Sequence, residues 1–258
     1  MGLAWRVAAV KIGVQDELAY RVEFLLSVVS SAVVPAAVQW VLWYALFSVG
    51  GATSVGGMSY SDLLAYTAAS VLFSQVRGGD YDFELAEMIR DGSLSNYLLK
   101  PVNVIEFVFL RAFGPKLLLA SLCFLVGSVV LSPVRMAAAM ILAILGNVIH
   151  YLLSSALASV AFYWEEAYSV LMVKNMVVGI LSGETIPLNL FPREWAWVWE
   201  YTPFYLYVFG PTQIALGKWD FAAFVHHLGI AVVWLFLAVA VATAAWRVGI
   251  KRYSSLGG

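Results

Sequence analysis

The sequence predicts an all-α polytopic membrane protein with six transmembrane helices, and three observations lead to this class. Of the 258 residues, 62% are hydrophobic and 12% are charged, whereas soluble domains carry roughly 25% charged residues. The mean hydropathy is +0.84. Several apolar runs reach the length of about 20 residues that a helix needs to cross a bilayer. We therefore treat residues 1–258 as a single transmembrane domain.

The first segment, residues 1–21, is predicted to form an amphipathic helix. Leu3, Val7, Val10 and Val14 recur at heptad-like spacing, with charged residues elsewhere around the helix. This pattern is typical of helices that lie in the membrane interface. We expect the helix to lie on the cytoplasmic surface before the first crossing.

Six apolar segments follow, and each is predicted to cross the membrane once. They are residues 24–47, 60–76, 104–131, 136–164, 167–181 and 222–246. Pro35 and Pro115 fall inside the first and third segments, where proline is expected to bend a helix. In the third segment, residues 117–131 are expected to be embedded in lipid and the preceding part to lie nearer the interface.

The distribution of basic residues predicts the orientation. With a cytoplasmic N-terminus, eleven basic residues fall inside and three outside, and Lys174 lies within a crossing. The inner ones are Arg6, Lys11, Arg21, Arg77, Arg90, Lys100, Arg111, Lys116, Arg247, Lys251 and Arg252, and the outer ones are Arg135, Arg193 and Lys218. The positive-inside rule therefore predicts that both termini and residues 77–103 are cytoplasmic.

Residues 80–103 form the longest interval of mixed charge in this apolar chain. Leu85, Met88 and Ile89 lie at i, i+3 and i+4, which predicts a short helix with one apolar stripe. Gly92 is expected to end this helix, and a second short helix is expected to begin at Ser93 or Ser95. The alternative is a solvated loop with a surface helix on lipid headgroups.

Leu94, Tyr97 and Leu98 repeat the apolar spacing in the second helix. Lys100 and Pro101 are expected to end it, because proline disfavours helical geometry in the residue before it.

Residues 183–220 differ from the other connections. They contain four prolines and four of the ten tryptophans. Prolines at this spacing exclude one straight helix, and indole rings favour the membrane interface. We expect short broken helices that dip into the outer leaflet and return, whereas the alternative is an extracellular loop with an aromatic belt.

No catalytic centre or metal site is predicted from the three histidines, the single cysteine and the carboxylates. A net charge of −1 gives no indication of a nucleic-acid partner. An ion-coupled secondary transporter would be expected to hold carboxylates within its crossings, yet only Lys174 is placed there. Polar and aromatic side chains in the crossings are candidates for a translocation path, although packing between helices or snorkelling would also explain them. They are Gln39, Tyr44, Tyr66, Asn147, His150, Tyr151, Lys174 and Asn175.

Two motifs and the predicted topology together resemble the type-two permeases of ATP-binding-cassette (ABC) exporters. The segment Ile89-Arg90-Asp91-Gly92-Ser93-Leu94, followed by Tyr97-Leu98-Leu99-Lys100-Pro101-Val102, resembles the family pattern I-x-x-G-x-L and then L-L-x-P. Residues 181–188, which lead to Phe191-Pro192, resemble the outer hairpin of the same group. The resemblance covers nearly the whole chain.

The resemblance implies that residues 87–101 couple this chain to a separate ABC ATPase subunit, beside the N-terminal helix. Gly92 would provide a break, Leu94, Tyr97 and Leu98 an apolar docking face, and Arg90 and Asp91 its polar rim. The complete implied coupling set is Glu87, Ile89, Arg90, Asp91, Gly92, Leu94, Tyr97, Leu98, Lys100 and Pro101.

The resemblance also implies the partners. ATP and Mg²⁺ would be bound by the ATPase, with no cofactor in this chain, and the pathway would be formed with a second copy or a sibling permease. The expected location is a bacterial-type plasma (inner) membrane, in contact with lipid. Export is favoured over import, and drugs, lipids, glycans and peptides are all compatible cargoes. The alternative functions are a secondary transporter and a membrane scaffold, neither of which has an ATPase partner.

Overall fold

The structure is a computed structural model that describes residues 2–77 and 81–253. Over these residues it is helical, apart from turns, loops and an isolated antiparallel bridge between Val55 and Met58. Asp80, which begins the charged interval of the sequence, lies outside the described residues, as do residues 78 and 79 and the two ends of the predicted domain.

The longer helices are α1 (Gly2–Ala19), α2 (Arg21–Tyr44), α3 (Tyr60–Arg77), α4 (Tyr81–Arg90), α5 (Leu94–Leu98), α6 (Val104–Val130), α7 (Pro133–Ala158), α8 (Ala167–Leu181), α9 (Ala196–Tyr201), α10 (Phe209–Ala215) and α11 (Phe221–Gly249). A π-helical turn, Ala45–Val49, extends α2, and 3-10 turns extend α7 over Ser159–Phe162 and α11 over Ile250–Arg252. Further 3-10 turns lie at Leu188–Leu190, Arg193–Trp195 and Phe204–Leu206.

Four helices in the described part of the chain are long and apolar enough to cross a membrane. They are Arg21–Val49, Val104–Val130, Pro133–Phe162 and Phe221–Arg252. The other two predicted crossings correspond to α3 and the shorter apolar helix α8. The all-helical membrane class is therefore confirmed, with four of the six expected crossings qualifying as spans by length and composition.

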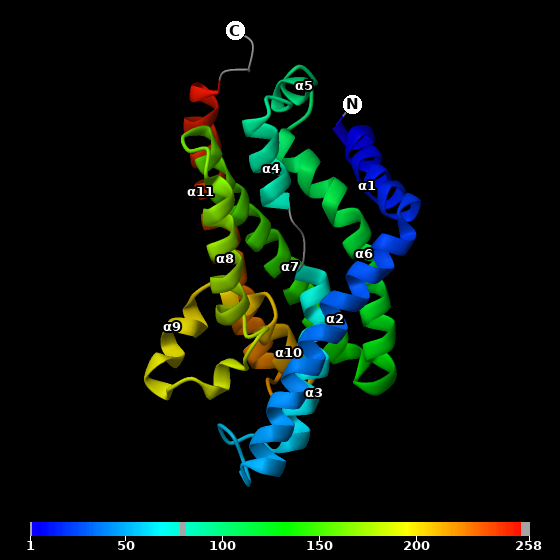
Figure 1. Cartoon of the computed structure of the whole chain (residues 1–258), viewed down its shortest axis with the longest axis vertical. Helices are drawn as coiled ribbons and strands as arrows, with labels where there is room; N and C mark the ends of the chain where they lie inside the picture. Colours follow the sequence, from blue (N-terminus) through cyan, green and yellow to red (C-terminus); the bar gives the residue numbers. More distant parts are fainter. Residues whose placement is uncertain (1, 78–80, 254–258) are drawn as a thin grey trace.

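The elements lie between two distinct ends of the molecule. The beginning of α1, helices α4 and α5 and the last turns of α11 lie at one end, which we call the elbow end (Figure 1). The loop after α2 and helix α9 lie at the other, which we call the α9 end (Figure 1). The start of the predicted N-terminal helix and the described part of the charged segment are thus at the same end.

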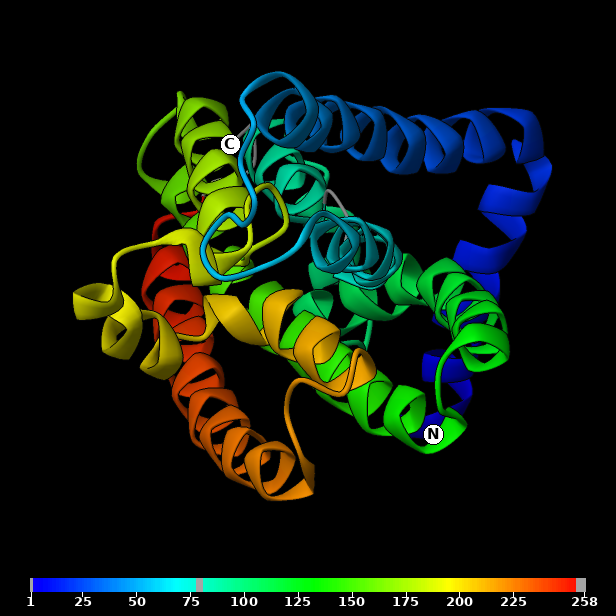
Figure 2. The ribbon, with the colours of Figure 1, turned by 90° about the horizontal axis from the view of Figure 1, so that it is seen from below.

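Helix α7 is the centre of the bundle, in contact with α3, α4, α6, α10 and α11. Ala139, Ala143 and Gly146 are small enough for neighbouring backbones to approach it closely. A Cβ atom at Gly146 would lie 2.5 Å from the carbonyl oxygen of Leu206. Helix α2 packs chiefly on α3 and lies at the edge of the molecule (Figure 2).

Helix α1 packs along α6, and only part of the predicted apolar stripe faces this contact. Leu3 and Val7 are 74% and 61% exposed, whereas Val10 and Val14 of the same stripe lie against Gly114 of α6. A Cβ atom at Gly114 would lie 2.6 Å from the carbonyl oxygen of Val10. The N-terminal helix is confirmed, and its side chains Arg6 and Asp16 form ion pairs with Glu106 and Arg111 of α6.

Helix α6 runs unbroken from Val104 to Val130, through Pro115. Its first turns were expected to form a separate helix nearer the interface, but they continue the same helix. Asn103 caps its N-terminus by accepting a hydrogen bond from the backbone N–H of Glu106, at 3.1 Å.

Candidate functional site

Helices α4 and α5 are joined by a sharp turn at Gly92. We call the two helices and this turn, residues 81–101, the elbow. Gly92 has a φ of +81°, a left-handed conformation that favours glycine, and it ends α4 as predicted. The carboxylate of Asp91 accepts a hydrogen bond from the backbone N–H of Ser93 at 2.8 Å, and this bond lowers the pKa of Asp91. The predicted pair of short helices is therefore confirmed.

The apolar side of α4 is buried within the protein. Leu85, Met88 and Ile89 pack with side chains of α6, α7 and α8 in one hydrophobic cluster, as their spacing predicts. Leu94 of α5 is 0% exposed and belongs to the same cluster. Leu94 and Ile89 therefore hold the elbow on the bundle, and the expectation that Leu94 lies on an exposed docking face is wrong for this structure.

The exposed tip of the elbow carries both apolar and charged side chains. Leu98 is 43% exposed and Leu99 is 88% exposed, while Tyr97 is half-buried with the Lys100 ammonium 5.1 Å from its ring centroid. Leu99, which the apolar spacing omitted, is thus the most exposed apolar residue there. The exposed polar and turn residues around it include Glu87, Arg90, Asp91, Lys100 and Pro101.

Tyr253 fastens the elbow to the end of α11, a contact that the sequence did not indicate. Its hydroxyl donates to the carbonyl oxygen of Gly92 at 2.8 Å and accepts from the backbone N–H of Ser95 at 3.1 Å. Its ring meets Phe162, after α7, edge to face. The positive-φ turn of the elbow is therefore held from a position 161 residues further along the chain.

Asn147 of α7 joins the end of α3 to the start of α4. Its side-chain amide donates to the carbonyl oxygens of Val76 and Arg77, at 2.8 and 2.9 Å, and to the Tyr81 hydroxyl at 3.3 Å. The Tyr151 hydroxyl donates to the carbonyl oxygen of Ile105, and its ring packs edge to face on Tyr81. Asn147 and Tyr151, two of the predicted path residues, thus form hydrogen bonds that join neighbouring helices.

Two ion pairs join separate segments of the bundle at buried or partly buried positions. Lys174 of α8 pairs with Asp82, which is 1% exposed, and also donates to Ser154. Arg77 pairs with Glu184 at 2.5 Å, with both side chains at most one quarter exposed. The sequence placed Lys174 alone among ionisable residues within a crossing and Arg77 at the exit of one. The structure pairs Lys174 with a buried carboxylate and Arg77 with a partly buried one.

The remaining predicted path residues have different environments. Gln39 is buried, donates to the carbonyl oxygen of Glu184 at 2.9 Å and accepts from Thr67. Tyr44 is 50% exposed on the outer side of α2.

His150 packs against Tyr207 with ring centroids 5.1 Å apart, and Asn175 is half-buried. The hydroxyl of Tyr66 donates to the carbonyl oxygen of Gly183 at 2.6 Å, so this side chain also joins two helical segments.

A cavity of about 970 Å³ opens between α1, α2, α3, α4 and α6 and was missed by the sequence analysis. Both members of the Arg77–Glu184 pair line it, as do Glu84 and Arg111, whose charged atoms lie 2.8 Å apart. Its walls combine charged side chains with serines of α2 and α3. Its lining residues are far apart in sequence, so no local spacing identifies them.

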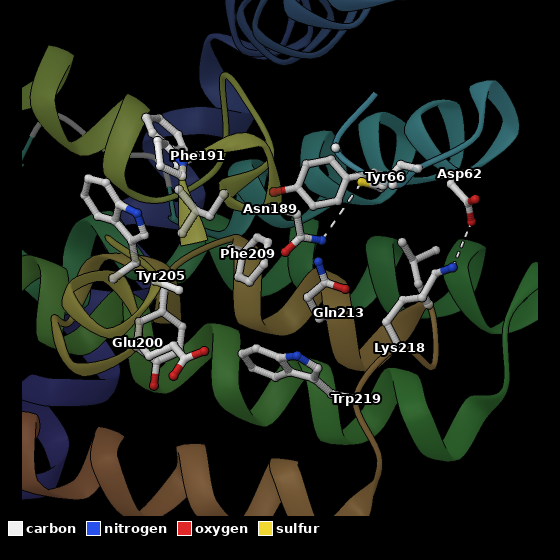
Figure 3. A pocket seen from close by; sticks show the side chains of 18 residues that line it. Asp62, Tyr66, Asn189, Phe191, Glu200, Tyr205, Phe209, Gln213, Lys218 and Trp219 are labelled. Carbon is white, nitrogen blue, oxygen red and sulfur yellow. Dashed lines mark hydrogen bonds and ion pairs between the residues drawn. The ribbon is translucent and has the colours of Figure 1, made fainter. Parts of the chain in front are cut away.

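A second cavity, of about 410 Å³, lies at the α9 end (Figure 3). Residues 183–220 form much of it, and they fold as the short broken helices that were predicted. Pro187, Pro192 and Pro203 lie between these helices, whereas Pro211 lies in the first turn of α10. Helix α10 is buried throughout and packs on α3 and α7, so the segment returns into the bundle. Tyr66 is the predicted path residue that lines this cavity.

Comparison with known proteins identifies the family. No curated protein matches the chain. The family model described as "ABC-2 family transporter protein" matches residues 33–257, which include every helix from α3 to α11. The chain therefore belongs to the ABC-2 family of membrane transporter proteins.

Proposed function

We propose that this chain is the membrane-spanning permease subunit of an ATP-driven ABC exporter, coupled through the elbow to a separate ATPase subunit. The observation that carries the proposal is the elbow itself, in a chain that belongs to a transporter family. One side of it is buried against the bundle and its tip is exposed at one end of the molecule.

The contacts of the elbow suit the transmission of a movement. Its buried side packs on α7, and Asn147 links its first turn to the end of α3. Tyr253 links its turn to the end of α11. A partner that pushed the exposed tip would therefore act on three long helices at once.

We assign the elbow end to the cytoplasm and all six predicted segments to crossings. The long helices run in alternating directions between the two ends, which supports this topology (Figure 1). The count of basic residues favours the same orientation. Both termini would then be cytoplasmic in a bacterial-type plasma membrane, with residues 183–220 re-entering from the outer side.

The passage would be formed by two permeases, either two copies or this chain with a sibling. The 970 Å³ cavity is lined in part by Glu84 and Glu87 of the elbow and carries partly buried charge, which supports its role as the inner part of the path. ATP and Mg²⁺ would be bound and hydrolysed in the ATPase subunit. Inward and outward access would alternate because ATP and substrate each favour a different state of the same assembly.

The test is to co-express the chain with candidate ATPase subunits and to measure co-purification and ATPase activity. Leu98→Asp and Leu99→Asp place a charge on the exposed apolar tip, so we expect each to lower co-purification at least about tenfold, or roughly 1.4 kcal/mol. Asn96→Asp is the matched control, because it adds the same charge at an exposed polar position of α5.

Gly92→Ala is a second variant, because alanine is strained at a φ of +81°. We expect it to leave binding of the ATPase measurable but to uncouple its activity from transport. Equal recruitment of the ATPase by wild type and both aspartate variants would contradict the assignment of the elbow. Transport that proceeds unchanged without any ATPase would favour a secondary transporter.

A further inference from the structure

We propose that the 410 Å³ cavity at the α9 end binds a sugar ring, as an uncharged ligand with both hydroxyl groups and an apolar face. The loop after α2 and helix α9, which supply part of its lining, lie at the opposite end from the elbow (Figure 1), so the proposal does not depend on an ATPase partner. Its volume lies within the range of about 300–1,000 Å³ that is usual for small-molecule sites.

The walls of the cavity are aromatic. Six rings from α3, α9, α10 and the turns between them line it, and several already contact one another edge to face. They belong to Tyr66, Phe191, Trp199, Tyr205, Phe209 and Trp219. Large flat apolar surfaces with polar edges suit a ligand that has an apolar face and a polar perimeter, as a pyranose ring does.

Two hydrogen-bond donors on these walls have no partner among residues 2–77 and 81–253. Gln213 is 3% exposed, its side-chain nitrogen makes no hydrogen bond, and its amide points into the centre of the cavity (Figure 3). The indole nitrogen of Trp199 is likewise buried and unpaired. A buried donor without an acceptor costs about 1–3 kcal/mol. A ligand oxygen at this position would remove that cost.

The charges around the cavity favour a ligand without net charge. The Lys218 ammonium lies 2.8 Å from the Asp62 carboxylate at its rim, and Glu200 provides a further carboxylate (Figure 3). The charges of Lys218 and Asp62 offset each other, and the remaining carboxylate belongs to the exposed Glu200, where solvent screens it. Hydroxyl groups can donate to the carboxylates and accept from Gln213, Trp199 and Lys218.

Two sources could supply such a ring: a free saccharide, or the sugar headgroup of a glycolipid. The test uses the full-length chain in lipid nanodiscs, because sugar-based detergents would compete for the site. Saturation-transfer NMR with maltose and with methyl glycosides of glucose, galactose, mannose and N-acetylglucosamine reports binding directly. Repeating the titration in nanodiscs with monoglucosyl diacylglycerol separates the sources, since an occupied site would weaken the maltose signal.

We expect saturable binding of at least one saccharide at millimolar concentration. Gln213→Leu and Trp199→Phe each remove one donor while keeping a similar apolar volume, so each should weaken binding about tenfold. Trp40→Phe is the matched control, since Trp40 is 51% exposed on α2 and should leave binding unchanged. Thermal unfolding of every variant checks that the fold is retained.

Three outcomes would overturn the proposal. The first is no saturation by any of these saccharides up to about 50 mM with folded wild-type protein, far above a millimolar Kd. The second is equal affinity in wild type, Gln213→Leu and Trp199→Phe. The third is tighter binding of choline or benzoate that the same variants abolish, which would assign the site to a charged ligand instead.

Discussion

Helices α2 and α7 are similar in length and apolar character but opposite in burial. They have 24 and 26 residues, and both are apolar enough to cross a membrane. Val33 and Val38 of α2 are 57% and 64% exposed, whereas Leu142 and Ile149 of α7 are both 0% exposed. Apolar character alone therefore does not show whether a membrane helix faces lipid, a second subunit or its own bundle.

The difference between the two helices lies in their small and polar residues. α7 presents Ala139, Ala143 and Gly146 to its neighbours, whose backbones approach closely, and Asn147 binds two of them. Along α2, Gln39 is an exception, because it is buried against α3 and the turn after α8. Close backbone approach and hydrogen bonds between helices, and not hydropathy, mark the buried surface.

The largest effect is expected from truncating buried and exposed side chains of the two helices. Ile149→Ala should destabilise the protein by about 2–5 kcal/mol, because it leaves a cavity in the centre of the bundle. Val38→Ala, its control on α2, should change stability by less than about 0.5 kcal/mol. Unfolding in detergent with increasing SDS measures both. Equal losses would show that the exposed side of α2 is itself packed in the native assembly.

A second test replaces a glycine by a bulky apolar residue at a packed and at an open position. Gly146→Leu should cost about 1–3 kcal/mol, because a Cβ there would meet the carbonyl oxygen of Leu206 at 2.5 Å and force α7 away from the turn at Leu206. Gly229→Leu in α11 has open space around its Cβ position and should be tolerated. Thermal unfolding in detergent compares them, and a stable Gly146→Leu protein would contradict the close packing of α7.

Gln39, the buried polar residue of α2, provides a test with a smaller expected loss of stability than Ile149→Ala. Gln39→Leu should cost about 1–3 kcal/mol, because the buried Thr67 hydroxyl loses its acceptor and the carbonyl oxygen of Glu184 loses its donor. The adjacent Trp40→Leu changes a residue that is 51% exposed and should have little effect on stability. If Trp40→Leu were the more damaging change in thermal unfolding, the described orientation of α2 would be wrong.

The smallest effect is expected at Asp91 of the elbow, which belongs to neither α2 nor α7. Its pKa is lowered by the Ser93 N–H, so the charged form is stabilised in the folded state. That contribution is present above the ordinary pKa of 3.8 and is lost as the pH falls through the lower folded value. Asp91→Ala should therefore differ from wild type by less than about 1 kcal/mol at pH 7.

The same comparison at lower pH gives the sign of the Asp91 contribution. The difference in thermal unfolding between wild type and Asp91→Ala should be unchanged at pH 5 and should shrink below about pH 4. A difference that grows in acid would contradict the assigned hydrogen bond.

The elbow shows how far local sequence could be taken. The spacing of Leu85, Met88 and Ile89 and the position of Gly92 were sufficient to predict two short helices and the break between them. They did not show that Leu94 faces inward, because burial of Leu94 depends on α7 and α8. Nor did they indicate Tyr253, since a single tyrosine after the last helix has no pattern of its own.

The sequence by itself determined the helical membrane class, the positions of the helices and the broken character of residues 183–220. Those features follow from local periodicity, from proline and glycine, and from the length of apolar runs. Tertiary structure alone decided that Lys174 pairs with Asp82, that Arg77 pairs with Glu184, and which side chains line the two cavities. These groups come from helices far apart in the chain, and their meeting depends on how whole helices pack, which no local pattern encodes.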